Sequence, residues 1–287
     1  MGCSSSPSEP EKRSWPCGFA PRQSNGKDQP PSSQEREPGC TAHDNRLAVE
    51  AMLHMAREGC TWRALPPDFG EWMTVYQRFS RWQQQGVFER LFQQFSRRTG
   101  VHSLMVDGTI IHVHQDGTGA RKTRGTPETQ GIGHSRGGRT TKLLAATDEN
   151  GQLISYMILP GNSGESPSLP DMIEGIEASA FIGDKANDTG NILKLEVSHK
   201  MEIVVPPKSN RKVQRPYDKE KYKTRHFVEN LFQRLKRFRR IATRYDKTAA
   251  SFPAFIILVA VYLVTKTSKS VLRYVEVTKR PKGSNDV

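Results

Sequence analysis

The chain has 287 residues, enough for one large domain and a small second one. Its 43 Lys and Arg outnumber its 30 Asp and Glu, and a formal net charge of +13 favours a polyanionic partner, most often nucleic acid. The four cysteines form no C-x-x-C pair, which argues against a disulfide framework and a zinc site. The longest apolar run, 252–264, is short and contains Pro253, so we expect a buried helix and no membrane partner.

Residues 1–43 differ in composition from the rest of the chain. They hold 7 of the 18 prolines and balance 5 basic against 5 acidic side chains, with no apolar period. Such a segment buries too little apolar surface to offset its conformational entropy. We therefore expect a disordered N-terminal tail.

Residues 44–98 predict a small helical domain. Apolar residues recur at helical spacing in three segments, with breaks near Gly59 and Gly86. Arginines lie outside the apolar positions, among them Arg78 and Arg81, as in a helix-turn-helix-like DNA-binding domain. The alternative is a plain helical cap with a charged, solvated face.

From residue 101 the pattern alternates between strands and helices. We expect strands at 103–106, 142–147, 153–159, 180–183 and 203–205, and helices at 169–177, 189–198, 223–240 and 250–266. The Gly-rich stretch 123–139 predicts a loop, and 271–287 a basic C-terminal tail. The order predicts an α/β fold for 101–270, a mixed sheet with flanking helices.

Two aspartates follow apolar strand segments. Asp107 comes after 103–106, and Asp184 closes the strand expected at 180–183. Sheets present residues at strand ends to a crevice, where ligands bind. A lone Asp in this position is more often a turn or helix cap, so neither aspartate alone indicates a site.

A third acid lies on the helix expected at 223–240. At about 100° per residue, Tyr222, Arg225, Glu229 and Lys236 would share an arc of about 60°, with the apolar residues opposite. The simple alternative is a surface pair of Glu229 with Arg225. That pair leaves Tyr222 and Lys236 on the same stripe without an explanation.

Three carboxylates with cations beside them fit phosphodiester chemistry. Two Mg²⁺ ions about 4 Å apart need several carboxylates, one ion activating the attacking hydroxyl and the other stabilising the leaving oxygen. Arg225 and Lys236 would hold phosphates, and Tyr222 would hydrogen-bond the DNA backbone. The window 208–247 carries 15 Lys or Arg and 4 Asp or Glu, hence +11 of the +13, as phosphate binding requires.

A Gly-rich segment at 131–141 is a second candidate DNA contact. It carries Arg136 and Arg139, and its glycines let the backbone approach phosphates closely. The alternative is a flexible loop. His112 and His114 would share a strand face, which we interpret as solvated or DNA-facing because Mg²⁺ prefers oxygen ligands.

The spacing of Tyr222, Arg225, Glu229 and Lys236 resembles the Tyr-Arg-Glu-Lys signature of bacterial insertion-sequence DDE transposases, which have a ribonuclease-H-like fold. Further stretches are similar to the same family and occur in its order: 59–66, 106–109, 133–138, 159–162 and 183–186. The resemblance covers residues 44 to about 266. Residues 1–43 depart from it, since the family usually begins with another helical segment there.

The resemblance implies that Asp107, Asp184 and Glu229 are the catalytic, metal-binding triad for Mg²⁺, with Mn²⁺ as a substitute. It implies cleavage of double-stranded DNA at terminal inverted repeats and strand transfer into target DNA, by a homodimer in the bacterial cytoplasm at the nucleoid. The DNA contacts that we expect are Tyr222, Arg225, Lys236, Arg136, Arg139, Lys185, Arg78 and Arg81.

Two other hypotheses stay open. One is a nuclease or Holliday-junction resolvase on the same fold, which would cut DNA without joining it. The other is a catalytically inactive DNA-binding remnant of a transposase. The presence of all three carboxylates argues against loss at the site itself.

Overall fold

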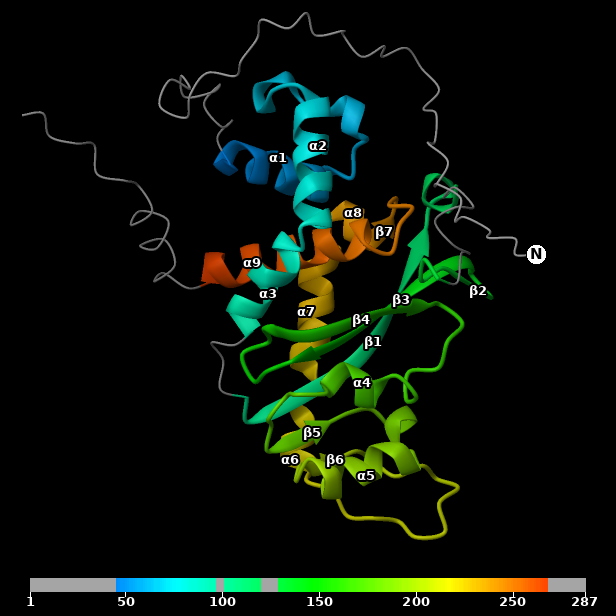
Figure 1. Ribbon diagram of the computed structural model, residues 1–287. Coiled ribbons are helices and arrows are strands. Elements are labelled where there is room, and N and C mark those ends of the chain that lie inside the picture. The colour runs from blue at the N-terminus through cyan, green and yellow to red at the C-terminus, as the bar shows by residue number, and fades with distance from the viewer. Residues whose placement is uncertain (1–44, 97–100, 120–128, 268–287) are drawn as a thin grey trace, which may run out of the picture. The chain divides into compact units, whose positions relative to one another are not determined.

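The structure is a computed structural model that describes residues 45–96, 101–119 and 129–267 (Figure 1). All of these residues belong to one compact unit. The tails expected at 1–43 and 271–287 lie outside the described residues, as does 123–128 of the expected loop. Within the described ranges no helix has the length and apolar character needed to cross a membrane.

The centre of the molecule is a mixed sheet built around one long strand. This strand is β1, and its neighbours are antiparallel on one side and parallel on the other. The order β4-β3-β1-β5-β6 places three antiparallel strands beside two parallel ones, so the expected ribonuclease-H-like mixed sheet with flanking helices is confirmed. The strands are β1 (Ser103–Val113), β2 (Gly133–Ser135), β3 (Gly138–Thr147), β4 (Leu153–Pro160), β5 (Ala180–Ile182), β6 (Glu202–Val204) and β7 (Thr243–Arg244).

Helices cover both faces of the sheet (Figure 1). Alternate residues of β1 enter two different cores, because side chains point to opposite faces along a strand. Leu104 and Val106 pack on the side of α4 (Leu169–Ile173) and α5 (Gly190–Ser198), and Met105 packs on the side of α7 (His226–Lys236). Asp107 continues the Met105 series and therefore faces α7.

The N-terminal helices pack onto the C-terminal ones. They are α1 (Asn45–Glu58), α2 (Trp72–Gln84) and α3 (Val87–Ser96), and they meet α8 (Arg239–Ala242) and α9 (Ser251–Thr267). Phe79 stacks on Phe255 with ring centroids 4.8 Å apart. Both expected breaks are left-handed glycines, Gly59 at φ +68° and Gly86 at φ +64°. The helical region is confirmed, and its separation from 101–270 as a domain stays a prediction.

Strand β1 is longer than the sequence indicated. The expected strand 103–106 continues to Val113, since the β-branched residues Thr109, Ile110 and Ile111 keep pairing with β3. Asp107 lies opposite Ala145 in the middle of the pair. Its expected place at a strand end is wrong, whereas Asp184 does follow the end of β5.

The prediction of a loop at 123–139 is also wrong for its last residues, from 133 onwards. Residues 133–135 and the start of β3 form a hairpin that turns at Arg136 and Gly137. Gly133 lies so close to the segment after β4 that a Cβ there would be 2.1 Å from Asn162 Oδ1. Gly133 therefore serves close packing against the segment after β4, whereas Gly138, at φ +92°, serves the turn of the hairpin.

The prediction of a single helix at 223–240 is wrong, because this part of the chain forms three separate helices. These are α6 (Lys219–Lys223), α7 and α8 (Figure 1). Between α6 and α7 the backbone bonds tighten to three-residue spacing: Arg225 N donates to Tyr222 O at 3.1 Å and Val228 N to Arg225 O at 3.2 Å. The helix expected at 169–177 likewise stops at Ile173, before Gly175 at φ +74°.

Candidate active site

Two of the three expected acids meet on one guanidinium. Arg225 Nη2 donates to Asp107 Oδ2 at 2.9 Å, and Arg225 Nη1 donates to Glu229 Oε1 at 2.6 Å. The side chains of Asp107, Arg225 and Glu229 are 15%, 23% and 46% exposed. A central strand and the first turn of α7 thus present two carboxylates, 122 residues apart in sequence, to the same cation.

The third acid lies beside the first through strand register. β1 and β5 are parallel, with Met105 opposite Ile182. Asp107 and Asp184 each come two residues after this pair, Asp107 within β1 and Asp184 just beyond the end of β5. Paired strands are about 4.8 Å apart, so the two aspartates start from neighbouring positions. Electrostatics agrees, because Asp184 contributes to raising the pKa of Asp107 and that of Arg225.

The electrostatic balance around Asp107 favours a bound cation. Burial raises the pKa of the Asp107 carboxyl, the Arg225 charge and the Gly108 N–H oppose this rise, and the charges of Glu165 and Asp184 reinforce it. The net direction is upward, so the carboxylate form is disfavoured even with Arg225 in contact. Further positive charge at this position would stabilise the ionised form.

Glu165 is an acid that sequence reasoning missed. A Cβ on Gly108 would come within 2.4 Å of Glu165 Oε1, so this carboxylate lies directly behind β1. It pairs with Lys142 at 3.2 Å on the α4 face. In the sequence, the only local hint of this close approach is Gly108, which follows Asp107. A larger residue at that position would collide with the Glu165 side chain.

Tyr222 and Lys236 lie on either side of the acids. The Tyr222 ring packs edge-on against Tyr217 at 5.6 Å. Burial raises the pKa of Tyr222, with the nearby Arg225, Asp184 and Glu229 also acting on it. Lys236 Nζ donates to Thr109 Oγ1 at 2.7 Å and to Ile110 O at 3.2 Å, and burial lowers its pKa.

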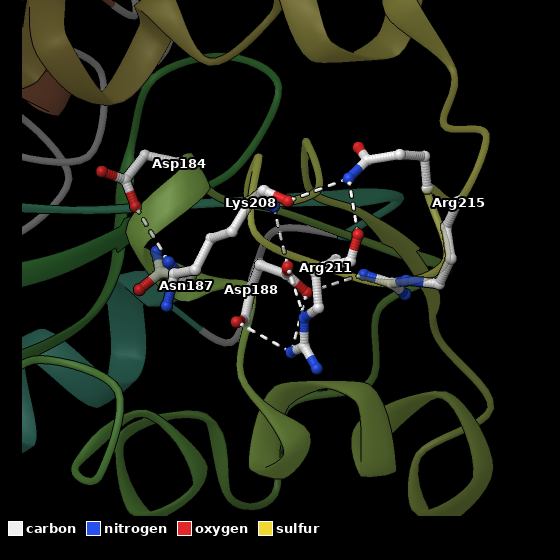
Figure 2. A network of polar contacts seen from close by, with 7 residues as sticks. Asp184, Asn187, Asp188, Lys208, Arg211 and Arg215 are labelled. Atoms are coloured by element: carbon white, nitrogen blue, oxygen red, sulfur yellow. Dashed lines mark hydrogen bonds and ion pairs between the residues drawn. The ribbon is translucent and has the colours of Figure 1, made fainter.

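Asp184 also begins a short turn. It is the N-cap of the 3₁₀ turn Lys185–Asn187, and its Oδ1 accepts a bond from Asn187 N at 3.2 Å (Figure 2). Lys185 is exposed beside it. Asn187 is 1% exposed, and neither polar atom of its side chain has a hydrogen-bond partner among the described residues.

The remaining basic candidates lie away from the acids. Arg136 and Arg139 are exposed on the β2–β3 hairpin, near His112 and therefore about 15 Å along β1 from Asp107. Arg81 is exposed on α2, and Arg78 Nη1 donates to Asn45 Oδ1 at 3.1 Å. The structure places Arg225 on Asp107 and Glu229, Lys236 on Thr109, and Lys185 next to Asp184 in the chain. The hairpin arginines lie farther along β1, and Arg78 and Arg81 lie on α2.

The donor set suits a hard divalent cation. Over residues 45–96, 101–119 and 129–267, no three His, Cys, Asp or Glu side chains lie close enough together to hold one metal ion. The oxygens of Asp107, Asp184 and Glu229 are nevertheless the ligand type that Mg²⁺ and Mn²⁺ prefer. Arg225 already supplies a positive charge between two of them.

Two family models match this chain. One, described as "Transposase DDE domain", matches residues 103–264, more than half of the 287 residues. The chain belongs to this family. The other, "Putative transposase of IS4/5 family", matches residues 29–92 and so begins inside the segment expected to be foreign to the family. The resemblance to insertion-sequence DDE transposases is thereby confirmed, and the Tyr-Arg-Glu-Lys signature stays a prediction.

Similar proteins occur in bacteria. The transposase-family chain is 35% identical over 108 residues to uncharacterized protein y4sN of Sinorhizobium fredii, covering 38% of this chain and 78% of that one. It is 32% identical over 119 residues to a "Putative transposase for insertion sequence element IS6501" of Brucella ovis, covering 41% and 92%. A crystal structure of the Mos1 strand transfer complex matches 74% of each chain at 12% identity, with a TM-score of 0.26.

Proposed function

We propose that this chain cleaves DNA at the ends of an insertion sequence and joins the freed 3′-hydroxyl to target DNA. Asp107, Asp184 and Glu229 would hold Mg²⁺, or Mn²⁺ in its place. One observation carries the proposal: the acids of β1 and α7 meet on Arg225, and Asp184 follows the end of β5, the strand that pairs with β1. A partly exposed group of carboxylates beside a guanidinium suits metal-assisted phosphoryl transfer.

Each residue of the site has a distinct part in this chemistry. When bound, the divalent ions would activate the attacking hydroxyl and stabilise charge at the leaving oxygen. Arg225 donates to both Asp107 and Glu229. With those carboxylates as ligands of the divalent ions, its N–H groups would be available to hold a phosphate. Lys236 is fixed on Thr109, on the same face of β1 as Asp107, where it positions the DNA strand.

Other basic groups would hold DNA farther from the chemistry. The helices α1–α3, with Arg78 and Arg81, would bind the terminal inverted repeat, and the hairpin arginines Arg136 and Arg139 the flanking backbone. Tyr222 would hydrogen-bond the backbone beside Glu229. Two transposon ends require two active sites, so we propose a homodimer.

Nearly isosteric variants test the triad. We expect Asp107→Asn, Asp184→Asn and Glu229→Gln each to abolish Mg²⁺-dependent cleavage of a labelled duplex that carries the terminal repeats flanking the gene. Binding to the duplex and thermal stability should stay near those of the original chain. Glu177→Gln is the matched control, because Glu177 is exposed beyond α4 and should retain full cleavage. Full cleavage by any triad variant contradicts the assignment.

A second assay separates the three hypotheses. A duplex with a pre-cut 3′-hydroxyl end is incubated with a supercoiled plasmid and Mg²⁺. Joined product supports a transposase, whereas cutting without joining supports a nuclease or resolvase. Binding with neither reaction supports an inactive remnant.

A further inference from the structure

The loop between β6 and α6, residues 205–218, is tied to one buried carboxylate. The Asp188 side chain is 0% exposed (Figure 2). Its Oδ2 accepts bonds from Lys208 N and Arg211 Nε, both at 2.9 Å, and its Oδ1 from Arg215 Nη2 at 3.0 Å. Arg211 Nη2 adds bonds to Oδ1 at 3.2 Å and to the Asp188 carbonyl at 3.0 Å. A single acid thus fixes two arginines and one turn of the loop.

The anchored loop keeps an excess of positive charge. Burial alone would raise the pKa of Asp188, but the bonds from Arg211 and Lys208 N and the charges of Arg211 and Arg215 outweigh it and lower the pKa. Asp188 therefore stays ionised and neutralises one guanidinium. The pocket around it is also lined by Lys208, Arg211, Lys212 and Arg215, four cations against one acid, which leaves +3.

The arginines remain accessible to a ligand. Their side chains are 39% exposed for Arg211 and 33% for Arg215. Each guanidinium carries five N–H donors in a rigid fork, and the bonds to Asp188 orient that fork while engaging only part of it. A pre-oriented, partly exposed pair of guanidinium groups matches the oxygens of a phosphate.

The pocket is joined to the proposed catalytic site by a short stretch of chain. Asp184 is the N-cap of the 3₁₀ turn Lys185–Asn187, and Asp188 is its C-cap. Figure 2 shows both aspartates at the two ends of this turn, with the arginines gathered around Asp188. A phosphate held at Arg211 and Arg215 would therefore be separated from Asp184 by a single short turn of the chain.

A purely structural role explains this network less well. One arginine is enough to neutralise a buried carboxylate, and a second arginine with two lysines adds charges that repel one another. Given the proposed DNA-cleaving function, on which this inference rests, we propose that residues 208–215 form a preorganised pocket for DNA backbone phosphate beside the catalytic acids. Asp188 is its positioning residue.

The first test removes positive charge from the pocket without changing the side chains that bond to Asp188. Lys208 enters the network through its backbone, since its N donates to Asp188 and its O accepts from Arg211 N and Gln214 Nε2. The donors to the Asp188 carboxylate are Lys208 N, Arg211 and Arg215, and Lys212 is not among them. We expect Lys208→Gln/Lys212→Gln to melt like the original chain. The slope of log affinity against log salt for a duplex, measured in EDTA, should become shallower by about 0.9 per lost phosphate contact. Lys194→Gln/Lys266→Gln, which changes two exposed lysines outside the pocket, is the matched control and should keep the original slope.

The second test separates positioning from net charge. Asp188→Asn makes the chain more positive, so diffuse attraction alone predicts tighter DNA binding. A pocket that Asp188 must orient predicts weaker binding, by about tenfold or more for a lost charge-assisted network. Both variants are measured on the full chain, with melting recorded alongside.

The outcomes separate this inference from the proposed function. An unchanged salt slope for Lys208→Gln/Lys212→Gln, or tighter binding by Asp188→Asn, would overturn the pocket even if cleavage and joining occur. Saturable binding of inorganic phosphate without DNA, lost in Lys208→Gln/Lys212→Gln, would assign the pocket to free phosphate and overturn its assignment to DNA. Loss of cleavage in triad variants bears only on the proposed function, since binding is measured without metal.

Discussion

Two arginine–carboxylate groups in this molecule have similar chemistry and different surroundings. Arg240 and Asp246 are 6% and 7% exposed and form two parallel bonds, Nε to Oδ2 at 3.1 Å and Nη2 to Oδ1 at 2.9 Å. Arg240 also donates to Cys60 O at 2.9 Å and lies 4.7 Å from the Phe255 ring centre. Arg225, in contrast, divides its donors between Asp107 and Glu229 at a more open position.

The difference distinguishes an ion pair that holds the fold together from one in the candidate active site. All three nitrogens of Arg240 donate a hydrogen bond, to Asp246 or to Cys60 O, and the guanidinium lies over the Phe255 ring, so Arg240 joins α8 to the segment after α1 and to α9. Arg225 meets two acids that belong to different elements, and its buried Nε has no hydrogen-bond partner among the described residues. An incompletely satisfied arginine among several acids is suited to exchanging partners, as ligand binding requires.

The largest expected effect is on the buried pair. Asp246→Ala should lower the free energy of unfolding by about 3–5 kcal/mol, because it leaves the Arg240 charge buried without its partner. Chemical denaturation measures this loss. Arg240→Met/Asp246→Leu should recover much of the stability, since no charge is then left buried. A stability loss below about 1 kcal/mol for Asp246→Ala would mean that water reaches Arg240.

Arg225 should show the opposite behaviour. Arg225→Gln is expected to reduce Mg²⁺-dependent cleavage by about 10²–10³-fold, the usual result of losing a charge donor in an active site. Stability should change by less than about 1 kcal/mol, because its partners are partly exposed. Arg46→Gln, which breaks an exposed pair with Glu50, is the control that should leave cleavage intact. A large drop in the melting temperature of Arg225→Gln would mean that Arg225 mainly stabilises the fold.

Lys236 should have an intermediate effect. Lys236→Gln is expected to lower the cleavage rate by about 10–100-fold with little change in DNA affinity, since it breaks charge-assisted bonds to Thr109 and Ile110. Single-turnover kinetics and a binding titration separate rate from affinity. Lys219→Gln, an exposed lysine at the start of α6, is the comparison. Equal rate losses in both variants would indicate a diffuse basic patch.

The smallest effect concerns pH and Asp188. Its pKa in the folded chain is lowered from 3.8, so its contribution to stability is present above the unfolded value and is lost as pH falls through the folded value. The stability difference between the original chain and Asp188→Asn should therefore be full near neutral pH and shrink below about pH 4. Denaturation at several pH values measures it. A stability difference that does not change with pH would show that Asp188 is not ionised in its network with Arg211 and Arg215.

Periodicity and spacing determined most of the local structure of this protein. Helices α1–α3 and α9, the hairpin of β3 and β4, and the strand leading to Asp184 follow from apolar patterns and glycine breaks within short windows. The three candidate acids were predicted because two follow short apolar runs in the sequence and one shares a helical stripe with Arg225. Family membership was indicated by motifs of a few residues each, which are likewise local.

Tertiary structure decided how those residues act together. Pairing with β3 carried β1 past Asp107, and the tight turn at Arg225 broke a helix that was continuous by pattern. Asp188 and its arginines are 23 and 27 residues apart in sequence, so no local pattern links them. Such contacts depend on which distant side chains the fold buries together, and the free energy of satisfying a buried charge selects among them only once the sheet has formed.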